Sequence, residues 1–236
     1  MSNPIELLRR LSEVATPTLV LLLAAAAGVT VLVHNWRIAL PATAAHFVLA
    51  GALLSQVLDP TVAFIKPLAG VVACLGVALA AFQADQMRQR IGQSIALERL
   101  RRPNWLQLPS QLLLRMIVAA LVLVTALNAA ARFPIPTSAP GLVAAAYVLA
   151  GFGLALIATS FEAMNIGLGI LLLLSAFELA FTPLEPSIGV SVLLAVVTLM
   201  VGLAVSVLTL ADVEPTDEPS QATLAEASLT ADAEVG

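Results

Sequence analysis

Four ionisable side chains stand within long apolar stretches of this sequence: Lys66, Glu178, His46 and Arg115. A charge in the hydrocarbon of a membrane costs free energy, so such residues point first to a functional site. Lys66 is the only lysine, and Pro67 directly follows it. Proline removes one backbone hydrogen bond, which would leave a polar opening beside the ammonium group. These four residues are therefore the candidates for a path for protons or other ions.

Each candidate also has a purely structural interpretation. Lys66 and Glu178 fall at similar depths on the same side, so we expect them to pair, with His46 and Gln56 as the next partners for the ammonium. Alternatively, each charge reaches the membrane surface while its stem stays in the apolar layer. Arg115, about one turn into its stretch, has the same alternative.

Other chemistry finds little support. The single cysteine, Cys74, excludes a disulfide framework, an iron–sulfur cluster and a zinc site built by this chain alone. His34 and His46 lie at unequal depths and make a poor haem site. Residues 159–162, Thr-Ser-Phe-Glu, match a capping box that would make Glu162 a structural residue at a helix start. We expect no cofactor, no metal and no catalytic residue.

The composition predicts an integral membrane protein. Of the 236 residues, 60% are hydrophobic and 11% are charged, against about 25% charged in soluble domains. We therefore expect the lipid bilayer, and no nucleic acid, as a partner. About 20 apolar residues span a bilayer as a helix. The fold class is thus all-α and polytopic, with seven transmembrane helices expected at residues 14–33, 38–58, 61–82, 112–131, 139–158, 163–181 and 188–211.

The polar stretch at residues 83–110 divides the chain and predicts its orientation. It holds five arginines and two acidic residues, and such loops stay on the cytoplasmic side. The N-terminus is then outside and the C-terminus inside, although Arg9 and Arg10 argue the other way. The expected units are a three-helix bundle at 1–82, a cytoplasmic loop with an interfacial helix at 83–110, a four-helix bundle at 111–211 and a disordered acidic tail at 212–236. The helix in the loop either rests on the membrane or docks a soluble subunit.

Two short motifs resemble a known family. Residues 34–40, His-Asn-Trp-Arg-Ile-Ala-Leu, and residues 64–68, Phe-Ile-Lys-Pro-Leu, are similar to the hydrogenase-4 component E family of membrane subunits. The resemblance implies seven helices with a lysine in the third. Residues 147–210 resemble the three-helix K subunit of respiratory complex I, through Asn-Ile-Gly-Leu-Gly-Ile at 165–170 and Val-Gly-Leu-Ala at 201–204. This sequence departs from both patterns, because Gly169, Leu172 and Thr198 stand where the relatives carry carboxylates.

The resemblance implies a subunit of a hydrogenase-4-like or complex I-like proton-translocating assembly in the cytoplasmic (inner) membrane. It would have no redox centre of its own and would mainly scaffold antiporter-like and quinone-chamber subunits, with Lys66 as a candidate element of a polar axis. A stand-alone transporter or ion antiporter is the alternative, although the sequence shows no inverted repeat. An accessory protein of another bioenergetic complex is the third hypothesis.

The orientation gives a testable prediction. Cysteines introduced at Gln93 and Ser220 should both be protected from a membrane-impermeant thiol reagent in intact cells. Labelling of Gln93 or Ser220 from outside would overturn the predicted topology.

Overall fold

The computed structural model describes residues 16–33, 35–95, 108–133, 140–160, 162–185 and 187–212. Within these ranges the chain forms helices and turns, and no strand. The helices are α2 (Thr16–Leu32), α3 (Trp36–Leu54), α4 (Pro60–Ala63), α5 (Ile65–Ile95), α6 (Leu108–Arg132), α7 (Pro140–Thr159), α8 (Ala163–Phe181) and α9 (Ile188–Ala211).

Six of the described segments are long and apolar enough to cross a membrane. They are α3, α4 together with α5, α6, α7, α8 and α9. The expected all-α, multi-pass architecture is confirmed at this level. The first expected crossing corresponds to α2, which is apolar but has only 17 residues in the described part of the chain. The seventh crossing and the orientation of the termini stay predictions.

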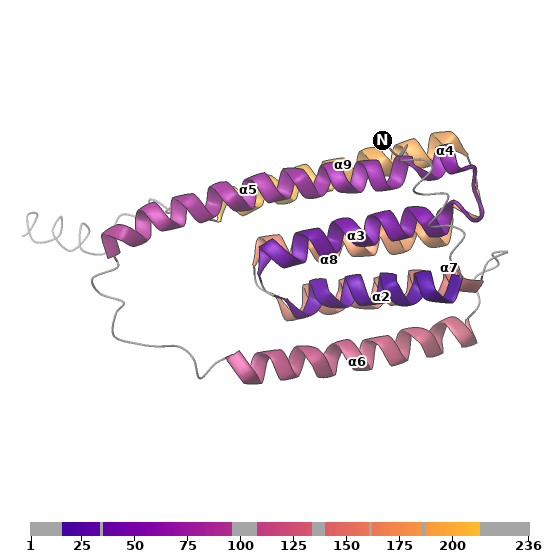
Figure 1. Ribbon diagram of the computed structural model, residues 1–236, viewed down its shortest axis with the longest axis horizontal. Helices are drawn as coiled ribbons and strands as arrows, with labels where there is room; N and C mark the ends of the chain where they lie inside the picture. The colour runs from indigo at the N-terminus through magenta and orange to yellow at the C-terminus, as the bar shows by residue number, and fades with distance from the viewer. Residues whose placement is uncertain are drawn as a thin grey trace, which may run out of the picture.

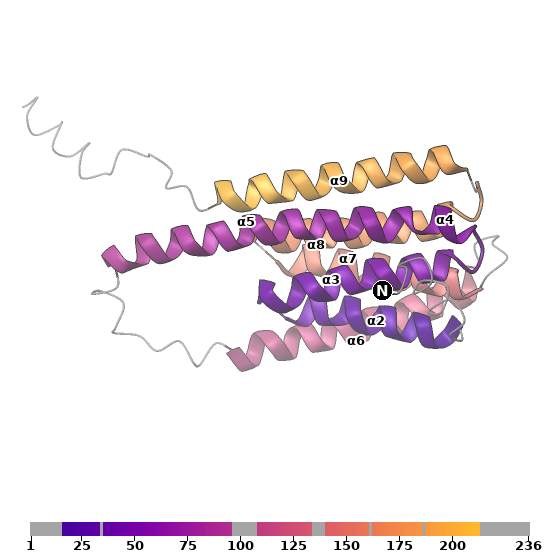
Figure 2. The same cartoon turned by 45° about the horizontal axis from the view of Figure 1, so that its top comes forward.

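The helices form two layers that run along the same axis (Figures 1 and 2). One layer holds α2, α3 and α5, and the second holds α7, α8 and α9, with α2 against α7, α3 against α8 and α5 against α9. α6 closes one edge by packing on α7 and α2. α8 is therefore central, since it contacts α7, α9 and α3.

Facing helices in the two layers run in the same direction. A Cβ atom at Gly202 of α9 would lie 2.6 Å from the Cβ of Ala73 on α5, and one at Gly76 would lie 3.5 Å from the Oγ of Ser206. These contacts advance together along both helices, so α5 and α9 are parallel. Figure 1 shows the same sense for α2 and α7. The described bundle thus consists of two three-helix layers in which each helix is parallel to the helix it faces. The two layers are therefore not related by inversion of their helix directions.

Several predicted helix ends are wrong. α5 continues to Ile95 instead of ending at Phe82, so residues 83–95 are continuous with the helix of the third crossing. The interfacial position of a helix in this loop stays a prediction. This stretch is rich in Gln, Arg, Met and Ala, which favour helix, and nothing in it ends one. Asp85 in the extension binds Arg37 at the start of α3, with Nη2 and Oδ2 3.3 Å apart. The rest of the predicted loop, residues 96–107, and the tail beyond residue 212 lie outside the described residues.

The ends of two other helices also differ from expectation. α3 ends at Leu54, four residues early, where Ser55 donates its hydroxyl proton to the carbonyl of Ala52. α6 begins at Leu108, because Pro109 is well suited to the first turn of a helix.

The predicted capping box at Glu162 is wrong. Glu162 is itself the N-cap of α8, with extended backbone and no capping hydrogen bond from its side chain. Its carboxylate instead accepts a hydrogen bond from Nδ2 of Asn165 at 3.1 Å, and the hydroxyl of Ser160 makes no hydrogen bond.

The third crossing is broken near its start. Asp59 caps α4, and hydrogen bonds from the hydroxyl and the amide of Thr61 lower the pKa of its carboxyl. Phe64 then interrupts the helix between α4 and α5, three residues before Pro67. α3 approaches this break through Gly51, where a Cβ would lie only 2.7 Å from the Cδ of Pro67.

Gly70 gives a prediction about packing. A Cβ there would lie 2.1 Å from the ring of Phe47, which is fully buried. Gly70→Ala should lower the free energy of unfolding in detergent by about 1–3 kcal/mol, as overpacked cores do. Gly189→Ala is the matched control, because no atom lies within 4 Å of its Cβ position. Phe47→Leu should restore stability to Gly70→Ala, and a Gly70→Ala protein as stable as the control would contradict this account.

Candidate functional site

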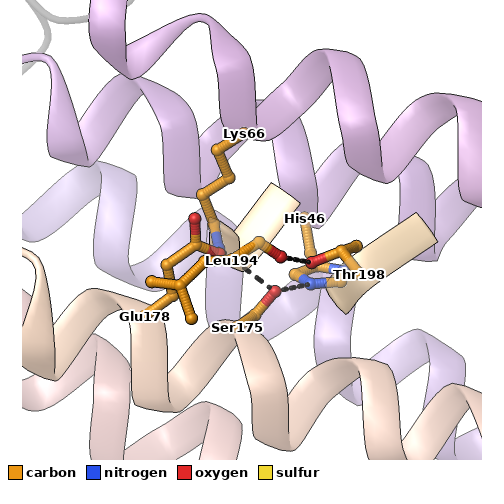
Figure 3. A network of polar contacts seen from close by, with 6 residues as sticks. All are labelled: His46, Lys66, Ser175, Glu178, Leu194 and Thr198. Atoms are coloured by element: carbon orange, nitrogen blue, oxygen red, sulfur yellow. Dashed lines mark hydrogen bonds and ion pairs between the residues drawn. The ribbon is translucent and has the colours of Figure 1, made fainter. Parts of the chain in front are cut away.

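Lys66 and Glu178 form a buried ion pair between the two layers. Lys66 lies in the first turn of α5 and Glu178 in the last turn of α8, and each is 4% exposed. The Nζ atom of Lys66 contacts Oε2 of Glu178 (Figure 3). The pairing expected from their similar depths is therefore present, and the alternative of two side chains reaching the membrane surface is wrong.

Ser175 connects this pair to His46. Ser175 lies one turn before Glu178, so both side chains project from the same face of α8. Its Oγ lies 3.4 Å from Nζ of Lys66 and 3.2 Å from Nε2 of His46. Figure 3 shows the three groups in a line, with contributions from α5, α8 and α3. The imidazole and the hydroxyl are buried as fully as the ion pair.

An aromatic ring lies beside the ammonium group of Lys66. The ring of Phe47 lies with its centroid 5.7 Å from Nζ, within the range of a cation–π contact. The ring of His46 packs on the same phenyl group, with centroids 4.3 Å apart. Desolvation of a buried pair nevertheless offsets much of its Coulombic attraction. The pair is therefore costly to break, yet adds little to stability over an apolar pair of the same size.

These four groups can hold and pass a proton. Lys66 donates to Ser175, and the hydroxyl proton of Ser175 can then point to Nε2 of His46. Protonation of Glu178 would break the ion pair, and movement of a proton from Lys66 to Glu178 would make both groups neutral. Carboxylate, amine and imidazole are all groups that transfer protons in proteins. The cluster therefore consists of buried groups that can exchange protons.

The other candidates lie elsewhere. Arg115 on α6 donates to the carbonyl of Val31 on α2 at 3.4 Å, which places it outside the Lys66 cluster. Gln56 accepts a hydrogen bond from Thr16 and is not among the groups bonded to Lys66. His34 lies outside the described residues.

The positions that carry carboxylates in the resembling families are filled differently. A Cβ at Gly169 would lie 2.9 Å from the carbonyl oxygen of Gly153, so no longer side chain fits between α8 and α7. Leu172 is fully buried. The hydroxyl of Thr198 donates to the carbonyl of Leu194 on its own helix, in the region that Figure 3 draws. The acidic group of this interface is thus Glu178, near the end of α8.

Ser175 was missed by the sequence-based interpretation. Serine is common in spanning helices, so its type alone gives no signal. Its spacing of three residues from Glu178 could have indicated a shared face. Within the described residues, no group of three or more histidine, cysteine, aspartate or glutamate side chains is arranged to hold a metal ion.

Comparisons with protein-family models, with curated proteins and with solved structures find no match for this chain.

The ion pair gives a prediction about stability. Lys66→Met should lower the free energy of unfolding in detergent by up to about 3–5 kcal/mol, because it leaves a lone buried carboxylate. Lys66→Met combined with Glu178→Gln should recover most of that loss, since no unpaired charge remains. Thermal unfolding of both variants and of Glu178→Gln alone measures the coupling. Additive effects of the two changes would show that the groups do not interact.

Proposed function

We propose that this chain is an integral membrane subunit of a hydrogenase-4-like or complex I-like proton-translocating redox assembly, and that the Lys66–Glu178 pair is a proton site within it. The observation that carries the proposal is the buried line of Lys66, Glu178, Ser175 and His46 between the two helix layers. Such a line is unnecessary for packing two apolar layers and is chemically suited to proton exchange.

The resemblance of residues 34–40 and 64–68 supports the choice of assembly. It gives the lysine of the third crossing a counterpart in hydrogenase-4 component E. The partners are then antiporter-like and quinone-chamber membrane subunits, with the proton site as an addition to a scaffolding role. α2 adds a seventh crossing to the six other spans, and it is the first along the chain. The N-terminus lies outside the cytoplasmic membrane and the C-terminal tail lies in the cytoplasm.

A stand-alone transporter or ion antiporter is the second candidate. Many such proteins are built from two inverted repeats with the binding site between them. In the described part of the chain, α5 and α9 are parallel, and the facing layers have equal direction. This arrangement differs from an inverted repeat, but other transporters are built from parallel repeats. Recovery of partner subunits and transport by the chain alone therefore decide between the two candidates.

The experiment has two parts, and the first is capture of the chain from native membranes. Affinity capture of the full chain in a mild detergent should recover antiporter-like and quinone-chamber subunits, identified by mass spectrometry. The purified chain alone, in liposomes, should carry no proton current. A chain that moves ions alone and recovers no such partners would instead be the stand-alone transporter.

The second part tests Lys66 in the intact assembly. In membrane vesicles, Lys66→Ala should lower proton transport per assembled complex while electron transfer to soluble acceptors continues, because the site loses its ammonium group. Lys66→Arg should keep part of the transport. Glu185→Gln, an exposed acidic residue near the end of α8, is the control and should transport normally. Normal transport by Lys66→Ala would leave only the scaffold role.

A further inference from the structure

We propose that the polar line of the Lys66 site continues from His46 through Thr43 and Thr30. We call this continuous series of polar groups the file, and it carries protons between the site and the end of the bundle where α2 ends. The inference rests on the proton site proposed above and adds its route. The route leads away from the Lys66 end of the bundle, toward the end from which residues 83–95 extend.

The two threonines form a hydrogen-bonded pair between helices. Thr43 of α3 and Thr30 of α2 are both fully buried, and their Oγ1 atoms lie 3.3 Å apart. Each hydroxyl also lies near a carbonyl of its own helix: Thr43 at 2.8 Å from that of Ala39, and Thr30 at 3.1 Å from that of Ala26.

This pair has more acceptors than protons. The two hydroxyl protons can serve only two of three bonds: Thr30 to Ala26, Thr43 to Ala39, and one between the threonines. The pair therefore has two fully connected arrangements, in which the bond between the threonines points in opposite directions. A group that passes protons must reverse its hydrogen bonds after each transfer, and this pair does so by rotating two hydroxyls.

The step from His46 to Thr43 is short. The two residues lie one turn apart on the buried face of α3, which puts their Cβ atoms about 5–6 Å apart. The ring of His46 contacts the backbone of Thr43, yet its Nδ1 atom is buried without a hydrogen bond of good geometry. One bridging water molecule closes a gap of this kind at little cost. His46 thus faces Ser175 with one nitrogen and the Thr43 turn with the other.

The file crosses most of the bundle. Thr30 lies two residues before the end of α2, and Glu178 lies three residues before the end of α8, at the opposite end (Figure 1). Beyond Glu178, the hydroxyl of Thr182 is buried without a hydrogen bond, one turn farther along the chain. Beyond Thr30, Arg115 donates to the neighbouring carbonyl of Val31. Polar groups therefore follow one another from one end toward the other.

A hydroxyl pair between spanning helices also has a structural role, since such bonds hold helices together. The two roles differ in what they require. Adhesion alone predicts that loss of the hydroxyls lowers stability and the amount of assembled complex. Proton transfer predicts a loss of transport in the complexes that do assemble.

The test uses the intact assembly in membrane vesicles. Thr43→Val and Thr30→Val keep the shape of the side chain and remove the hydroxyl, and each should lose most of the proton transport per assembled complex while electron transfer continues. Thr43→Ser restores a hydroxyl and should recover transport. Thr209→Val is the matched control, because that buried hydroxyl donates at 2.7 Å to the Val205 carbonyl of its own helix, away from the file.

The outcomes separate this inference from the proposed function. If Thr43→Val and Thr30→Val transport normally per complex while Lys66→Ala does not, the site stands and the route is wrong. If the valine variants only reduce the amount of complex, the threonine pair is structural and the route is likewise wrong. If Lys66→Ala also transports normally, the proposed proton site fails, and the file fails with it.

Discussion

The burial of one positive and one negative charge constrains the rest of this bundle. Lys66 and Glu178 are each 4% exposed, so neither is tolerable in the interior without the other. α5 and α8 must therefore stay close, although they belong to different layers. The break at Phe64 and Pro67 flank Lys66 along the chain, and Gly51 lets α3 approach that break. Lys66 thus lies where α3 packs closely on α5.

The parallel layers bring together residues that are distant in the sequence. His46 of α3 meets Ser175 of α8, while Ala73 of α5 meets Gly202 of α9, and both contacts join helices that run in the same direction. α6 takes no part in this correspondence, because it packs at the edge on α7 and α2. Its exposed face has the apolar character expected for contact with lipid. The polar groups of the Lys66 site are thus enclosed by the two layers.

The sequence alone predicted the helical class, most of the crossings and the Lys66–Glu178 pair, because hydropathy and depth follow directly from residue order. It did not predict the end of α5, since a helix that leaves the hydrocarbon meets water and polar residues that support it equally well. The capping box at Glu162 failed because the pattern describes residue types, whereas the cap depends on where the backbone leaves the extended region. Ser175 and Thr43 were missed for a related reason. A hydroxyl in a spanning helix bonds its own backbone by default, and only the neighbouring helix shows which hydroxyls also reach across.

The packing of the two helix layers does not require the ion pair of the Lys66 site. Spanning helices pack through small residues, and this chain already provides them within the second layer at Gly153 and Gly169 and between the layers at Gly202. A buried ion pair adds little to such packing, because an apolar pair of similar volume is commonly as stable or more so. Packing of the layers therefore does not by itself account for the buried charges. Gly169 leaves no room for a carboxylate between α8 and α7. Glu178 sits near the end of the same helix, where it pairs with Lys66, and Ser175 connects Lys66 to His46. A proton site built from a Lys–Glu pair at this depth needs a connection to the far end of the bundle, and the hydroxyls of Thr43 and Thr30 lie in that direction.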